Sequence, residues 1–158
     1  EGKNVEFVIE AFIELYKRGF KAQITFYGGS EERLEELRNR YDLPPTIHFK
    51  GIVDEVPYHL HQCYLSASFT ELFANACVEA LNQGLLALLS DVEIAHRFYA
   101  GQSDAIRLFR NKAQLIQMIE EMEQADYRQS NAENIALAAH YSLGTVVQSY
   151  RELLDRKF

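Results

Sequence analysis

The chain has 158 residues, of which 47% are apolar and 25% charged, and this composition is typical of one globular domain with its own core. Its formal charge of −7, with basic residues dispersed among acids, argues against a nucleic-acid partner. No apolar run approaches the roughly 20 residues that span a bilayer, and the first residues lack the regions of a signal peptide. We therefore expect a cytoplasmic protein.

The first part of the chain predicts a helix, a strand, a glycine turn and a second helix. Apolar residues recur at helical spacing from Val5 onward, and Gly19 follows where this helix would end. The β-formers of "AQITFYGG" then run into paired glycines, which indicates a strand and a tight turn. Ser30 is placed to cap the next helix, whose first turn carries Glu31 and Glu32.

The same alternation continues along the chain. The pattern predicts strands near residues 46–50, 64–68, 85–89 and 105–109, and helices near 55–62 and 73–83. From residue 111 the pattern is helical to the end, with an apolar face on the last helix near 146–154. Strands that alternate with helices predict right-handed crossovers and a parallel sheet covered on both faces, an α/β fold.

In such a sheet, ligands bind beyond the carboxyl ends of the strands, where helix N-termini offer unpaired amides to anions. Gly28 and Gly29 follow a predicted strand and would let the backbone approach a ligand, although a plain turn explains them equally well. Val53 follows the chain-breaking Gly51 and would be free to lie against a flat ring. Neither feature decides between a ligand site and an ordinary loop.

The stretch "TELFANACVEAL" places two acids in an otherwise almost uncharged run. If its helix starts near Phe73, Glu71 precedes the positive helix end and Glu79 lies about 12 Å further along, a length of the order of a nucleotide sugar. The alternative is that Glu79 belongs to a solvated strip with Asn75 and Asn82, while Glu71 is only a favourable charge at a helix N-terminus. Spacing alone leaves both open.

Five segments together resemble a known family. "SASFTELFANACVEALNQGLLALLSDV" resembles the signature segment of the C-terminal domain of retaining GT-B glycosyltransferases of family 4, the glycosyl transferases group 1. Four further segments are similar to other parts of that domain, in the same order: "EGKNVEFVIEAF", "ITFYGGSEERLEEL", "IHFKGIV" and "YSLGTVVQSYRELL". The resemblance covers nearly the whole chain and implies one Rossmann-like, doubly wound, nucleotide-sugar-binding domain over residues 1–158, with a helical C-terminus.

The resemblance also implies roles for individual residues. Glu79 would accept hydrogen bonds from the ribose hydroxyls of a nucleotide donor, and Glu71 would be the catalytic carboxylate at the hydroxyls of the donor sugar. Lys3 would neutralise the leaving diphosphate, on which negative charge develops during transfer. The remaining implied donor-binding positions are Gly28, Val53, Leu72, Phe73 and Ala74. No metal and no cofactor is implied, and the histidines and cysteines show no metal-ligand spacing.

The implied activity is transfer of a hexose, with retention, from a nucleotide-diphosphate sugar to a polysaccharide, lipopolysaccharide or glycolipid acceptor of the cell envelope. The acceptor would bind to an N-terminal domain that this chain lacks, and that domain would supply any peripheral membrane contact. The family's first strand also precedes Lys3, so we expect a truncated sheet, self-association of the fragment, weak donor binding and no turnover by the fragment alone.

Two alternatives stay open. Leu72 and Ala74 stand where the family usually has glycines, which favours an interaction module that has kept the fold and lost the chemistry. A nucleotide-sugar epimerase of GT-B architecture is the second alternative, but it would require more catalytic acids and a histidine beside the nucleotide.

Overall fold

The computed structural model describes residues 2–69, 75–92, 95, 99–104, 106–122 and 128–141, without the side chains of 128–131. The chain forms two compact units. Unit 1 comprises Glu1–Pro57, Ala67–Thr70 and Phe109–Ala125, and unit 2 comprises Tyr58–Ser66, Glu71–Leu108 and Asp126–Phe158. Among the helices that the structure describes, none is both long and apolar enough to cross a bilayer.

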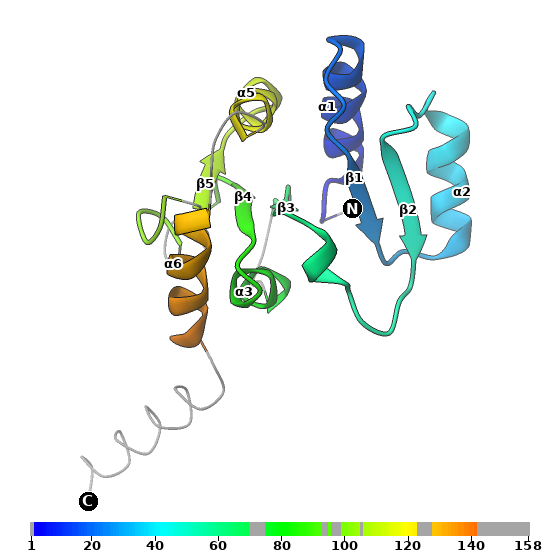
Figure 1. The fold of residues 1–158 in the computed structure, drawn as a ribbon. Coiled ribbons are helices and arrows are strands. Elements are labelled where there is room, and N and C mark those ends of the chain that lie inside the picture. Colours follow the sequence, from blue (N-terminus) through cyan, green and yellow to red (C-terminus); the bar gives the residue numbers. More distant parts are fainter. Residues whose placement is uncertain are drawn as a thin grey trace, which may run out of the picture. The chain divides into compact units, whose positions relative to one another are not determined.

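Unit 1 is built on a pair of parallel strands with helices beside them (Figure 1). Strand β1 pairs with β2 in a register that sets Ile24 opposite Ile47, and the rings of Phe26 and Phe49 stack at 5.2 Å between centroids. A helix connects the two strands, as a parallel pair requires. The elements of unit 1 are α1 (Val5–Lys17), β1 (Ile24–Tyr27), α2 (Glu31–Arg40), β2 (Ile47–Gly51) and α5 (Lys112–Met122).

Capping side chains and a glycine set the ends of the helices in unit 1. Helix α1 buries an apolar stripe and ends before Gly19, whose φ of 92° suits glycine. The Ser30 side chain accepts a hydrogen bond from the Arg33 backbone N–H at 3.3 Å and so caps α2, which confirms the predicted cap. Asn111 caps α5 in the same way through the backbone N–H of Gln114 at 3.0 Å.

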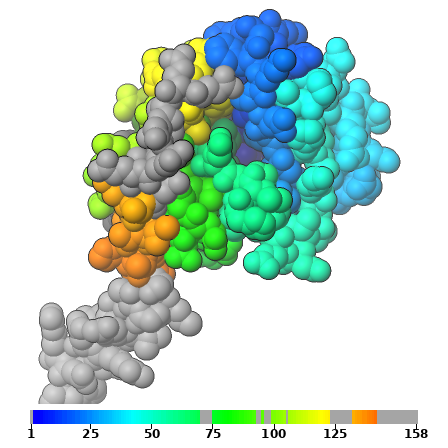
Figure 2. Space-filling view, viewed as in Figure 1, coloured from blue at the N-terminus to red at the C-terminus, as the bar shows by residue number. Residues whose placement is uncertain are grey.

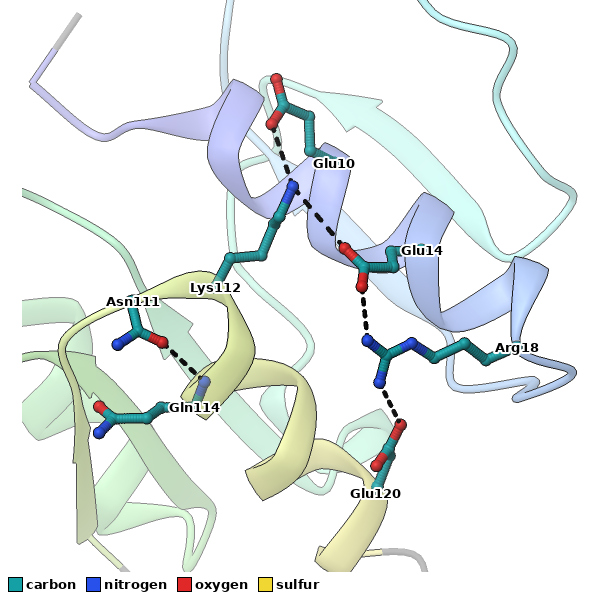
Figure 3. Close-up of polar contacts among 7 residues, drawn as sticks. All are labelled: Glu10, Glu14, Arg18, Asn111, Lys112, Gln114 and Glu120. Atoms are coloured by element: carbon teal, nitrogen blue, oxygen red, sulfur yellow. Dashed lines mark hydrogen bonds and ion pairs between the residues drawn. The ribbon is translucent and has the colours of Figure 1, made fainter.

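Helices α1 and α5 are joined by a run of ion pairs along their exposed sides (Figure 3). Lys112 Nζ lies 3.6 Å from a Glu10 oxygen and 3.7 Å from a Glu14 oxygen. Arg18 bridges Glu14 at 2.5 Å and Glu120 at 3.3 Å. Because these charges are exposed, the ion pairs contribute little to stability and mainly align the two helices. The free energy that stabilises the packing comes from the buried apolar side chains of the helices.

Unit 2 contains a three-stranded sheet in the order β3–β4–β5, with β3 and β4 parallel (Figure 1). Strand β4 is buried along almost all its length, as expected of the middle strand of a covered sheet. The sheet and its helices enclose a core that includes Cys77, Leu81 and Tyr99. The elements of unit 2 are η1 (Tyr58–Leu60), β3 (Cys63–Ser66), α3 (Asn75–Asn82), β4 (Leu86–Ser90), β5 (Ile106–Phe109, its last residue in unit 1) and α6 (Arg128–Ala139).

A buried asparagine ties α6 to the rest of unit 2. Asn134 is 0% exposed, and its Nδ2 donates to the Leu85 carbonyl at 2.6 Å while its Oδ1 accepts from Ser103 Oγ at 2.8 Å. A buried amide that satisfies both of its ends in this way fixes one placement of the helix that carries it. Asn134 therefore positions α6 against the start of β4 and the turn before β5.

The predicted α/β fold with parallel strand pairs and flanking helices is confirmed, but one element was predicted wrongly. The helix expected near 55–62 is only the 3₁₀ turn η1. Pro57 disfavours the helical conformation for the preceding Val56, so just a few residues remain before β3 begins at Cys63. The helix predicted near 146–154 lies outside the described residues.

Candidate functional site

The glycine turn after β1 belongs to unit 1 and has the backbone conformation that a close approach requires. Gly28 and Gly29 have φ of 91° and 84°, and the Gly28 N–H donates to the Gly51 carbonyl at 2.6 Å. Among the described residues, no atom lies within 4 Å of where a Cβ at Gly28 would be, so these residues leave the space beside Gly28 open. The first turn of α2 that follows carries Glu31 and Glu32, which disfavour a phosphate at that helix N-terminus.

The other two predicted positions in unit 1 are exposed. Lys3 lies just before α1, and the neighbouring Gly2 carbonyl accepts a hydrogen bond from the Phe69 N–H at 3.2 Å. Val53 is 37% exposed and Ile52 is 83% exposed, in the loop after β2. Figure 2 shows this connection between β2 and β3, coloured turquoise, at the surface. Exposed aliphatic side chains suit contact with a flat, partly apolar ring.

Glu79 lies on α3 in unit 2 and is exposed together with Asn75 and Asn82, as the alternative of a solvated strip predicted. Cys77, Ala80 and Leu81 turn toward the core, which leaves the Glu79 carboxylate toward solvent. Its Oε2 accepts a hydrogen bond from the Tyr58 hydroxyl at 3.0 Å. Within the described part of the chain no hydrogen-bond donor contacts Oε1, so the carboxylate keeps one oxygen and further lone pairs for a ligand.

Tyr58 was not singled out by the sequence, and it is the residue that the structure brings to Glu79. It opens η1, whose turn is closed by the His61 N–H donating to the Tyr58 carbonyl at 2.9 Å. Partial burial and then the hydrogen bond to Glu79 raise the pKa of Tyr58 to about 12. The hydroxyl therefore stays protonated and remains a donor to Glu79 at neutral pH.

The thiol of Cys63 on β3 stays protonated at neutral pH, because its pKa is raised. Burial raises its pKa to about 12, and its Sγ lies 3.3 Å from the Tyr64 carbonyl. Cys63 and Cys77, the two cysteines of the chain, form no disulfide. Over the described residues, no group of three or more histidine, cysteine, aspartate or glutamate side chains could hold a metal ion.

The predicted site residues are distributed over both units. Lys3, Gly28 and Val53 belong to unit 1, and Glu79 belongs to unit 2. The other predicted positions, Glu71, Leu72, Phe73 and Ala74, lie outside the described residues.

The comparisons with known proteins decide the family. The family model for glycosyl transferases group 1 matches residues 1–124, which is most of the chain. The chain belongs to the glycosyl transferases group 1 family. No curated protein sequence matches the chain.

Several solved structures of glycosyltransferases have the same fold as this chain. The GtfA/B complex matches with a TM-score of 0.80 at 19% identity, over 98% of this chain and 33% of that one. HepE of Anabaena, in complex with UDP-glucose, matches with a TM-score of 0.76 at 18% identity, over 98% of this chain and 46% of that one. A glycosyltransferase of Rickettsia africae ESF-5 matches with a TM-score of 0.81 at 16% identity, over 97% and 44% of the two chains. The Rossmann-like α/β fold of GT-B glycosyltransferases is therefore confirmed, and the chain spans between a third and a half of these structures' length.

Proposed function

We propose that residues 1–158 form the donor-binding domain of a two-domain GT-B glycosyltransferase. The family match over residues 1–124 supports a glycosyltransferase. The share of each solved structure that the chain covers, 33% to 46%, fits one of two domains. The UDP-glucose bound to HepE supports a nucleotide sugar as the donor. The acceptor would then bind to the other domain.

The observation that carries this proposal is the Glu79 carboxylate, which is exposed on α3 and accepts a hydrogen bond from the Tyr58 hydroxyl. A carboxylate accepts two hydrogen bonds from a vicinal diol, and the ribose of a nucleotide presents such a diol. The hydrogen bond from Tyr58 occupies part of Oε2 and leaves Oε1 to the ligand. In this proposal Glu79 binds the ribose hydroxyls of the donor.

The remaining roles follow from the family resemblance. Glu71 would bind hydroxyls of the donor sugar beside the reacting carbon, and Lys3 would stabilise the charge that develops on the leaving diphosphate. The exposed Val53 would contact the base, and the open space beside Gly28 would admit the donor. Backbone amides of the segment Leu72, Phe73 and Ala74 would face the diphosphate.

The finer activity that we propose is metal-independent transfer of a hexose, with retention, to a polysaccharide, lipopolysaccharide or glycolipid of the cell envelope. No cofactor takes part, because the nucleotide sugar is itself the activated donor. The enzyme would act in the cytoplasm, and its acceptor domain would provide any contact with the membrane surface.

Calorimetric titration of the complete enzyme with UDP-, GDP- and ADP-sugars tests the proposal. We expect one nucleotide class to saturate, and Glu79→Ala to weaken its binding by about 10- to 100-fold, because two hydrogen bonds to a charged group are lost. Glu35→Ala is the matched control, since Glu35 is an exposed helical glutamate in unit 1. Absence of binding to every sugar nucleotide, with the fold intact, would instead support the interaction module.

A further inference from the structure

The Tyr58 hydroxyl faces two acceptors on α3. Glu79 Oε2 lies 3.0 Å away and the Ala76 carbonyl oxygen lies 3.4 Å away. One hydroxyl proton cannot serve both acceptors fully, and the nearer, ionised oxygen makes the stronger bond. The structure therefore pairs Tyr58 with the Glu79 carboxylate rather than with the helix backbone.

We propose that Tyr58 is a positioning residue that holds the Glu79 carboxylate in the orientation that accepts both ribose hydroxyls, so that the site discriminates ribonucleotides from 2′-deoxyribonucleotides. This inference rests on the proposed function, because it assigns Glu79 to the ribose of the donor.

The physical reason is the freedom of an exposed glutamate. Glu79 is exposed and its side chain has several rotatable bonds, so an unrestrained carboxylate would lose conformational entropy on binding the diol. Tyr58 is half-buried and its carbonyl accepts the His61 N–H that closes the turn, so its backbone is held and its ring has less freedom than the exposed Glu79 side chain. Fixing Oε2 also fixes the direction of Oε1, which makes the acceptor pair complementary to a diol before the ligand arrives.

The two hydroxyls of a ribose use this arrangement fully, whereas a 2′-deoxyribose offers only one of them. Losing Tyr58's hydroxyl should therefore weaken ribonucleotides more than deoxyribonucleotides. A purely structural role for Tyr58 would weaken both ligands by the same factor, since it would change the site without regard to the 2′ position.

The test measures dissociation constants of the complete enzyme for UDP, GDP, ADP and their 2′-deoxy counterparts. The variants are Tyr58→Phe, Glu79→Ala and the double variant, with Tyr16→Phe as the matched control on an exposed tyrosine. For the nucleotide that binds, we expect Tyr58→Phe to lower the preference for the ribo form about 3- to 10-fold. In the Glu79→Ala background the same substitution should have no further effect, because the two residues act through one carboxylate. In turnover assays the donor KM should rise by a larger factor than kcat falls, as expected for a contact made equally in the bound and transition states.

The outcomes separate the inference from the proposed function. If Glu79→Ala lowers the ribo preference and Tyr58→Phe does not, the inference is overturned and the proposed function stands. If Tyr58→Phe weakens binding of the ribonucleotide and of the 2′-deoxyribonucleotide by the same factor and also lowers the melting temperature, Tyr58 is structural and the inference is again overturned. If neither Glu79→Ala nor Tyr58→Phe changes any nucleotide affinity, both the inference and the proposed role of Glu79 fail.

Discussion

Replacing Asn134 by alanine should destabilise unit 2 strongly. Asn134 is 0% exposed, and the substitution removes both the 2.6 Å bond to the Leu85 carbonyl and the 2.8 Å bond from Ser103. Each buried group that loses such a partner costs about 1–3 kcal/mol, and the truncation also leaves a small cavity. We therefore expect the free energy of unfolding to fall by about 2–4 kcal/mol, which is roughly 5–12 °C in melting temperature for a chain of this size.

Urea and thermal unfolding followed by circular dichroism measure this loss. Glu133→Ala is the matched control, because Glu133 is the preceding residue of α6 and is exposed, and we expect it to change stability by less than about 0.5 kcal/mol. Ser103→Ala should cost less than Asn134→Ala, and the double variant should cost less than the sum because the two share one bond. An Asn134→Ala variant as stable as Glu133→Ala would refute the assignment of Asn134 as the residue that positions α6.

Three further predictions concern a helix cap, a pH response and Glu71, the proposed catalytic carboxylate. Ser30→Ala should lower the free energy of unfolding by about 1 kcal/mol in urea titrations, because α2 loses its N-terminal cap, and an unchanged midpoint would contradict the cap. The pKa of Glu6 is held below its usual range, first by a hydrogen bond from its own backbone N–H and further by Arg33. Glu6 therefore stabilises the fold at a pH above its unfolded pKa, and this contribution is lost as the pH falls through its pKa in the folded state. Glu6→Gln should accordingly unfold with a shallower pH dependence below about pH 4, and a pH profile parallel to the wild type would argue against the shift. Glu71→Gln in the complete enzyme should lower kcat more than donor affinity, and a variant with wild-type kcat would remove Glu71 from the site.

The parts of the fold that could be predicted from the sequence are those fixed by local chemistry. The β1 strand, the turn at the paired glycines after it and the cap at Ser30 follow one another within a few residues, and each prediction is confirmed. The exposed flank of α3 was predicted in the same way, since helical spacing separates Glu79 from the buried Cys77 and Leu81. These features depend on neighbours in sequence, so a single chain contains the information.

The features that the sequence did not predict depend on residues that are distant along the chain. Tyr58 and Glu79 are 21 positions apart, and Asn134 and Leu85 are 49 apart, so no periodicity connects either pair. The wrongly predicted helix near 55–62 shows the same limit at shorter range, because Pro57 and the start of β3 leave too few residues for an α-helix. The hydrogen bond between Tyr58 and Glu79 depends on how η1 and α3 pack within unit 2.

A crystal structure of the complete enzyme with the bound nucleoside diphosphate would examine the proposed role of Glu79. We predict that the ribose O2′ and O3′ atoms lie within hydrogen-bond distance of the Glu79 carboxylate, about 2.5–3.0 Å, with the Tyr58 hydroxyl still on Oε2. A nucleotide whose ribose is held by other residues, with Glu79 left in solvent, would contradict it.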